Sequence, residues 1–140
     1  MFSQVLSQIH WLHVFVAALA YFALGSIWYS PALFARQWIK LNNIDVNNPD
    51  AKKGMARLFI SSFILMCITS TGLAILQQVL PAIDFMGGLK LGLLVSITLV
   101  ATSVSVNYLY TKKPLGLYFI DNGYHIVGIV IASGIMAGWH

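Results

Sequence analysis

Two ionisable side chains, Asp121 and His125, interrupt an otherwise apolar segment near the end of the chain. They lie four residues apart, so they share one face of a helix. An ionisable group inside a membrane span costs about 2.5 to 3.5 kcal/mol on insertion scales and is by default a functional hypothesis. The pair could carry a proton or bind a cation. The structural alternative is that hydrogen bonds, or an ion pair with Arg36, hold Asp121 and lock a helical bundle.

Other polar side chains are expected at the depth of Asp121 when consecutive spans alternate in direction. The expected polar cluster consists of Asp121, His125, Asn122, Asn107, Tyr29 and Trp28. It serves either as a binding site or as a structural tie between helices.

Four apolar windows carry these residues, and each is long enough for a spanning helix of about 20 residues. They cover residues 9–29, 58–80, 91–110 and 115–139. Hydrophobic residues make up 59% of the 140 residues and charged residues only 9%, against about 25% charged in soluble domains. We therefore expect a single all-α membrane domain over residues 1–140, with four spans forming an antiparallel bundle in a lipid bilayer.

The eight Lys and Arg residues are distributed unevenly over the predicted loops. Seven lie in the first and third loops, and only Lys90 lies in the second. Because cytoplasmic loops carry an excess of Lys and Arg, the first and third loops are predicted to be cytoplasmic and both termini outside. No nucleic-acid partner is expected, since such surfaces need many clustered cations.

The first loop, residues 30–57, contains a predicted amphipathic helix at about 31–41. Ser30-Pro31 is a typical helix start. Aromatic and cationic side chains would anchor this helix among lipid headgroups: Phe34, Arg36, Trp38 and Lys40. The alternative is a dedicated site for a lipid or a protein partner. A second start signal at Pro49 predicts a helix that runs on into the second span.

Small residues predict where helices approach closely in lipid. The fourth segment carries Gly128, Ala132, Gly134 and Gly138, the last two forming a GxxxG motif. They would pack against another helix of the chain or a second subunit, and we expect a homo-oligomer. The third segment is polar on two sides and is expected to be central in the bundle, where it could line a pore.

Three histidines, His10, His13 and His140, are predicted at the outer membrane level. They form a weak candidate metal site, and the ordinary alternative is contact with headgroups and water. The single cysteine, Cys67, excludes an intrachain disulfide. No catalytic motif is found, so we expect neither an enzyme nor a cofactor.

Several stretches together resemble a known family. These are the run from Leu24 to Phe34 that contains W-Y-S-P-x-L-F, then Ala101-Thr102-Ser103, Asn107-Tyr108-Leu109 and Asn122-Gly123-Tyr124-His125. They resemble a family of small four-span bacterial proteins catalogued as domain of unknown function 1761. The resemblance implies a bacterial inner-membrane protein and supplies no activity. Asp121 falls beside the family pattern.

The sequence leaves three functional hypotheses. The first is a homo-oligomeric carrier, channel or binding protein for a small solute, ion or lipid that uses the polar cluster. The second is a structural or accessory protein that docks a partner through the basic first loop. The third, a membrane enzyme acting on lipid or quinone, has the least support because catalytic motifs are missing.

Overall fold

The computed structural model describes residues 1–50, 53–81 and 83–139, and its elements are all helical. Before the second predicted span lie α1 (Phe2–Ser7), α2 (Trp11–Trp28) and α3 (Ala35–Leu41). The remaining elements are α4 (Met55–Val79), α5 (Phe85–Val95), the π-helical turn η1 (Ser96–Ala101), α6 (Thr102–Tyr110) and α7 (Leu115–Gly138).

Four helices are long and apolar enough to cross a membrane: α2, α4, the continuous helix Phe85–Tyr110 and α7. The predicted all-α, four-span fold class is therefore confirmed. The third helix begins six residues before the predicted boundary of residue 91, because Asp84 caps it. Its Oδ1 accepts a hydrogen bond from the Gly87 backbone N–H at 2.8 Å, which satisfies one of the unpaired donors of a helix start.

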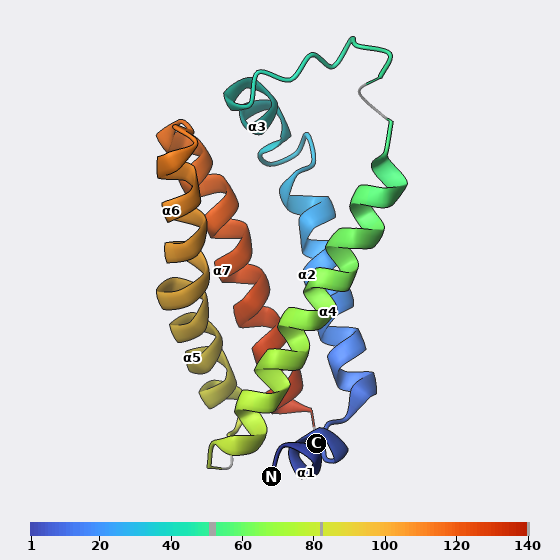
Figure 1. Ribbon diagram of the computed structural model, residues 1–140, viewed down its shortest axis with the longest axis vertical. Coiled ribbons are helices and arrows are strands. Elements are labelled where there is room, and N and C mark those ends of the chain that lie inside the picture. The colour runs from blue at the N-terminus through green and yellow to red at the C-terminus, as the bar shows by residue number, and fades with distance from the viewer. Residues whose placement is uncertain (51–52, 82, 140) are drawn as a thin grey trace.

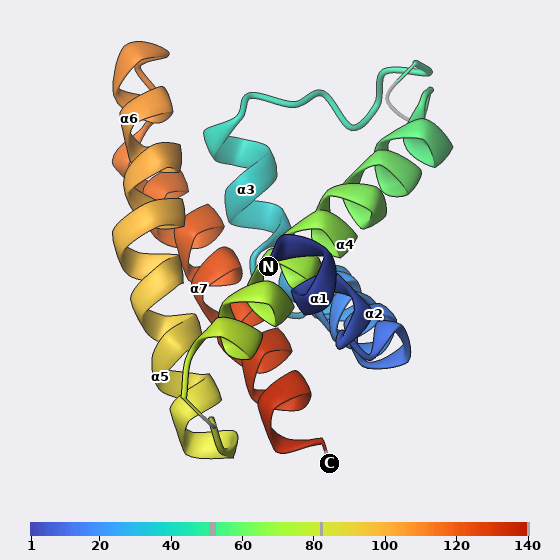
Figure 2. The ribbon, with the colours of Figure 1, turned by 60° about the horizontal axis from the view of Figure 1, so that its bottom comes forward.

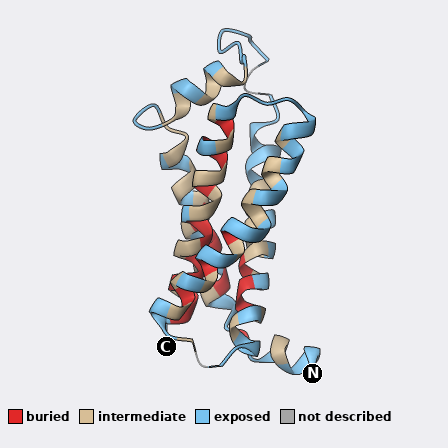
Figure 3. Cartoon of the chain, turned by 90° about the vertical axis from the view of Figure 1, so that its left-hand side faces the viewer, coloured by how far each residue is buried: buried red, intermediate tan, exposed pale blue. Residues whose placement is uncertain are grey.

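Both termini lie at one end of the bundle, and α3 and the turn after α6 lie at the other (Figure 1). We call these the terminal end and the basic end, since among the described residues the basic end holds six Lys and Arg residues, against Lys90 alone elsewhere. Figure 3 shows that the buried residues concentrate toward the terminal end.

Helix α7 is the centre of the bundle. The third span packs on one side of it and α2 on the other, while α4 lies mainly on α2 (Figures 1 and 2). The expectation of a central third span is therefore wrong, and several of its polar side chains are satisfied within their own helix. The hydroxyls of Thr98 and Thr102 donate to the carbonyls of Leu94 and Thr98, four residues earlier, at 2.6 and 2.7 Å. This back-bonding lets Thr face lipid.

The first loop differs from its prediction at both ends. Residues 31–34 form a turn, so α3 is shorter than the predicted 31–41. The predicted helix from Pro49 is wrong within the described residues, since residues 49–50 also form a turn. Gly54 then adopts a left-handed conformation with φ of 75°, which glycine tolerates and a continuing helix does not, so α4 starts at Met55.

Helix α4 leans away from α7 toward the basic end (Figures 1 and 2). Its buried residues are Ser70, Leu73 and Ala74, in the half nearer the terminal end. Residues 55–61, at the start of the helix, are all exposed. The divergence leaves space between α4, α2 and α7 on the side of the polar residues.

Candidate functional site

Asp121 lies buried on α7, with 7% of its surface exposed. Its carboxylate accepts a hydrogen bond at each oxygen. The Tyr29 hydroxyl donates to Oδ1 at 2.5 Å, and the Tyr108 hydroxyl donates to Oδ2. Tyr29 ends α2 and Tyr108 lies on α6, so one carboxylate ties two helices that lie on opposite sides of α7.

Trp28 fixes the end of α2 next to this carboxylate. Its indole N–H donates to the backbone carbonyl of Ile120 at 2.9 Å. Phe34, in the turn before α3, packs on the Trp28 ring with centroids 5.0 Å apart. This indole bond positions Tyr29 because the two residues are adjacent in sequence.

The structure brings together only part of the predicted polar cluster. Asn107 is exposed on α6, and its neighbour Tyr108 reaches Asp121 instead. Asn122 points elsewhere and donates to Ser105 Oγ at 2.9 Å. Its Oδ1 is buried without a hydrogen-bond partner among the described residues.

His125 bonds to α2 rather than to Asp121. Its Nδ1 shares a hydrogen bond with the hydroxyl of Tyr21. The Tyr124 hydroxyl donates to the Tyr21 backbone carbonyl at 2.9 Å. Asp121 and His125 therefore make separate hydrogen bonds from the same helix, α7, rather than acting as the predicted pair.

The sequence analysis did not include Tyr21, Tyr108 and Tyr124 in the polar cluster. A tyrosine inside a span is nevertheless a recognisable signal, because its buried hydroxyl needs a hydrogen-bond partner.

Asp121 has no cationic partner in the described part of the chain. The only ion pair there joins Lys53 and Asp50 at 3.0 Å, and both side chains are exposed. Arg36, the partner considered from sequence, is exposed on α3. A buried charged carboxylate is costly unless it is paired or well hydrogen-bonded. Two tyrosine hydroxyls are the bonds that Asp121 receives here.

A cavity of about 690 Å³ reaches Asp121 from the space beside α4. We call it the basic-end cavity. Its walls come from α2, α3 and α4 and from α7, and most of its lining side chains are apolar or aromatic. Among the described residues that line it, Asp121 is the only charged one. Tyr29, Trp38 and Tyr124 also line it.

The predicted interfacial anchors divide into two pairs. Phe34 and Trp38 turn toward the bundle, with Trp38 packed edge-on against Tyr29 at 5.7 Å between centroids. Arg36 and Lys40 are exposed. The aromatic face of α3 thus covers the site, and its cationic side chains point away.

The predicted packing residues make contacts within the chain. A Cβ added at Gly128 would lie 2.5 Å from Cδ1 of Tyr21, and one at Gly134 or Gly138 would lie under 3.0 Å from Leu89 or Phe85. Ala132 is fully buried. The GxxxG motif therefore packs α7 on α5 of the same chain.

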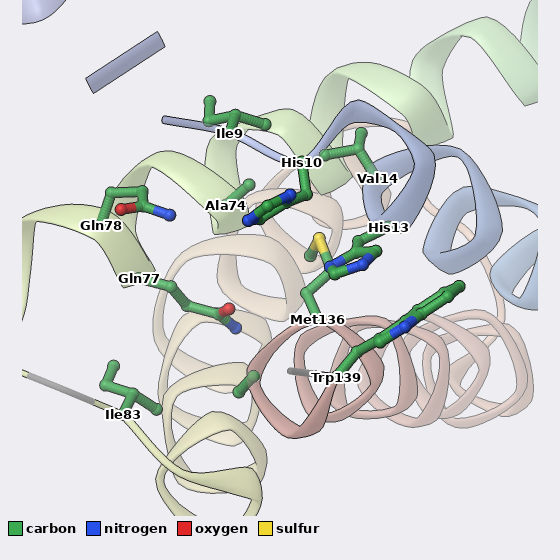
Figure 4. A pocket seen from close by; sticks show the side chains of 11 residues that line it. Ile9, His10, His13, Val14, Ala74, Gln77, Gln78, Ile83, Met136 and Trp139 are labelled. Atoms are coloured by element: carbon green, nitrogen blue, oxygen red, sulfur yellow. The ribbon is translucent and has the colours of Figure 1, made fainter. Parts of the chain in front are cut away.

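The outer histidines line a second cavity, of about 360 Å³, at the terminal end. His10 and His13 stack at 4.9 Å between centroids, and His13 stacks on Trp139 at 4.1 Å (Figure 4). His140 lies outside the described residues. Within those residues, no group of three His, Cys, Asp or Glu could hold a metal ion.

Four helices of spanning length around a buried carboxylate define a class, the small multi-pass membrane proteins. The chain belongs to the family described as "Protein of unknown function (DUF1761)", whose model matches residues 12–137. The resemblance seen in the sequence is confirmed. No curated protein and no solved structure matches the chain, so function has to be argued from the site.

Proposed function

We propose that the protein binds a small membrane-soluble molecule in the basic-end cavity and acts as a carrier or binding protein for it. The observation that carries the proposal is a large apolar cavity with one buried carboxylate at its end. Its volume of about 690 Å³ lies within the range of about 300 to 1,000 Å³ that is typical of small-molecule sites.

The composition of the cavity supports a molecule with an apolar body and one polar group. Apolar and aromatic side chains supply most of the wall, while a few placed polar groups orient a ligand in such sites. Among the described residues, the lining side chains that carry a polar group are Asp121, Tyr29, Tyr124, Ser26, Ser62 and Trp38. A sugar or a nucleotide needs many more hydrogen bonds than this lining offers.

The location of the cavity supports uptake from one side of a membrane. It lies at the basic end, which the charge distribution predicts to be cytoplasmic. In that orientation, with both termini outside a bacterial inner membrane, the cavity lies in the inner leaflet. The small residues of α7 pack against helices of the same chain, so a second subunit would contact the exposed side of the third span instead. A homo-oligomer is therefore compatible with this role.

Photolabelling in lipid nanodiscs tests the proposal. A neutral alkyl amphiphile with a diazirine should label cavity residues such as Met66 and Tyr124. Filling the cavity with Ser62→Trp should abolish that labelling. The control is Ser61→Trp, one residue away on the exposed side of α4, which should leave it intact. Labelling confined to lipid-facing positions such as Leu65, and unchanged by Ser62→Trp, would overturn the proposal and favour the accessory role.

A further inference from the structure

We infer that the ligand of the basic-end cavity is an apolar organic cation, an amine or onium group on an aromatic or alkyl body, whose positive charge binds at Asp121. The inference rests on the proposed function and names its substrate class. The cavity, the buried carboxylate and the surrounding rings carry it together.

The charge of the cavity selects a cation. Asp121 is the only charged residue in the described lining, and no Lys or Arg of the described chain pairs with it. A ligand anion would meet an uncompensated like charge there. A cation would supply the partner that a buried carboxylate lacks.

The carboxylate also has room for a further contact. Its two oxygens offer about four lone-pair sites, and the hydroxyls of Tyr29 and Tyr108 occupy two of them. Tyr29 lines the cavity and Tyr108 does not. The side of the carboxylate next to Tyr29 is therefore where a ligand approaches.

Aromatic rings surround that approach. Tyr29 packs edge-on against Trp38 and against Tyr124, with centroids 5.7 and 5.4 Å apart, and all three line the cavity. A cation within about 6 Å of a ring face is attracted by the ring quadrupole, most strongly once it is desolvated. Phe22 and Phe59, farther along the wall, suit the apolar body.

A bare metal ion fits the site less well. Hard divalent cations take six or more oxygen ligands, several of them carboxylate or carbonyl. Around Asp121 the described side chains provide one carboxylate and tyrosine hydroxyls that already donate to it. An organic cation needs only one counter-charge and a desolvated wall.

Two probes of the same shape and opposite charge test this inference. Tetraphenylphosphonium and tetraphenylborate are each titrated into protein in nanodiscs of zwitterionic lipid, with empty nanodiscs subtracted. The phosphonium should bind at least about tenfold more tightly, a modest value for one desolvated charge pair. Asp121→Asn should remove this preference.

Two further variants separate the possible outcomes. Ser62→Trp, which keeps Asp121, should block both probes, while Ser61→Trp should block neither. If both probes bind equally well and Ser62→Trp removes both, the cavity still binds ligands but the preference for cations is overturned. The same conclusion follows if Asp121→Asn, or an Asp121→Ala variant that elutes as a single folded species, binds the phosphonium unchanged. If neither probe binds and the neutral photolabel also fails, the proposed function fails as well.

Discussion

The two ends of the bundle are built on different principles. At the terminal end, small residues let helices touch: the backbone of α5 at Gly88 and Gly92 approaches α7 so closely that side chains there would collide with it. At the basic end, α4 leans away and a cavity lies between the helices. There α7 is connected to its neighbours by hydrogen bonds from Tyr29, Tyr108 and Trp28. The comparison places the closest helix packing at one end and the cavity of the proposed ligand at the other.

The largest expected effect is a loss of stability when the close packing at the terminal end is disrupted. Gly88→Leu places a side chain where Ser133 O lies 2.8 Å from the added Cβ and Ala137 lies closer still. Overpacking typically costs about 1 to 3 kcal/mol, and more is expected here because the clash is with backbone. Unfolding in mixed detergent micelles measures the loss. Gly72→Leu is the control, since nothing lies within 4 Å of its Cβ. Equal losses in the two variants would show that the close approach is not essential.

The next largest effect tests the hydrogen bonds to the Asp121 carboxylate at the basic end. Tyr108→Phe leaves Oδ2 of Asp121 without its donor, and an unsatisfied buried acceptor costs about 1 to 3 kcal/mol. The same unfolding measurement applies. Tyr110→Phe, at a side chain 85% exposed, should change nothing. In an Asp121→Asn background the cost of Tyr108→Phe should shrink, and an undiminished cost would argue against the bond.

A smaller effect is expected at the end of α2. Trp28→Phe keeps an aromatic ring against Phe34 but removes the bond to the Ile120 carbonyl. A neutral hydrogen bond contributes about 1 kcal/mol net. The matched change is Trp11→Phe, at an indole 54% exposed. Thermal unfolding of the two variants should separate them, and identical midpoints would contradict the role given to Trp28.

The smallest effect concerns orientation and should leave the fold unchanged. In a Cys67→Ala background, a cysteine is placed at Lys113 in the basic-end turn or at Ser3 at the terminal end. An impermeant maleimide added to intact cells should label Ser3→Cys and spare Lys113→Cys until the cells are opened. The reverse pattern would place the basic end outside.

The sequence predicted the spans well because hydropathy is a property of each segment by itself. It also marked the face of α7 that holds Asp121. It did not find Tyr108, because choosing between Asn107 and its neighbour required knowing which face of the third span meets α7. The polar residues Thr98 and Thr102 did not identify that face, because their hydroxyls are hydrogen-bonded within their own helix.

The cavity could not be predicted from the sequence properties of the individual helical segments. It exists because α4 separates from α7 between its start and Ser70, and a helix tilt depends on the packing of several neighbours at once. The same limit applies to α3. Its amphipathic pattern predicts a lipid anchor, and it does not reveal that Phe34 packs on Trp28 and Trp38 on Tyr29.

The Asp121 carboxylate has one oxygen bonded from the cavity side and one from behind. Tyr29 holds the first and lines the cavity, while Tyr108 holds the second from a helix that does not line it. Any event that neutralises this one group alters both bonds at once. If the proposed ligand pairs with Asp121, its binding would therefore affect the hydrogen bond from Tyr108, although α6 does not line the cavity.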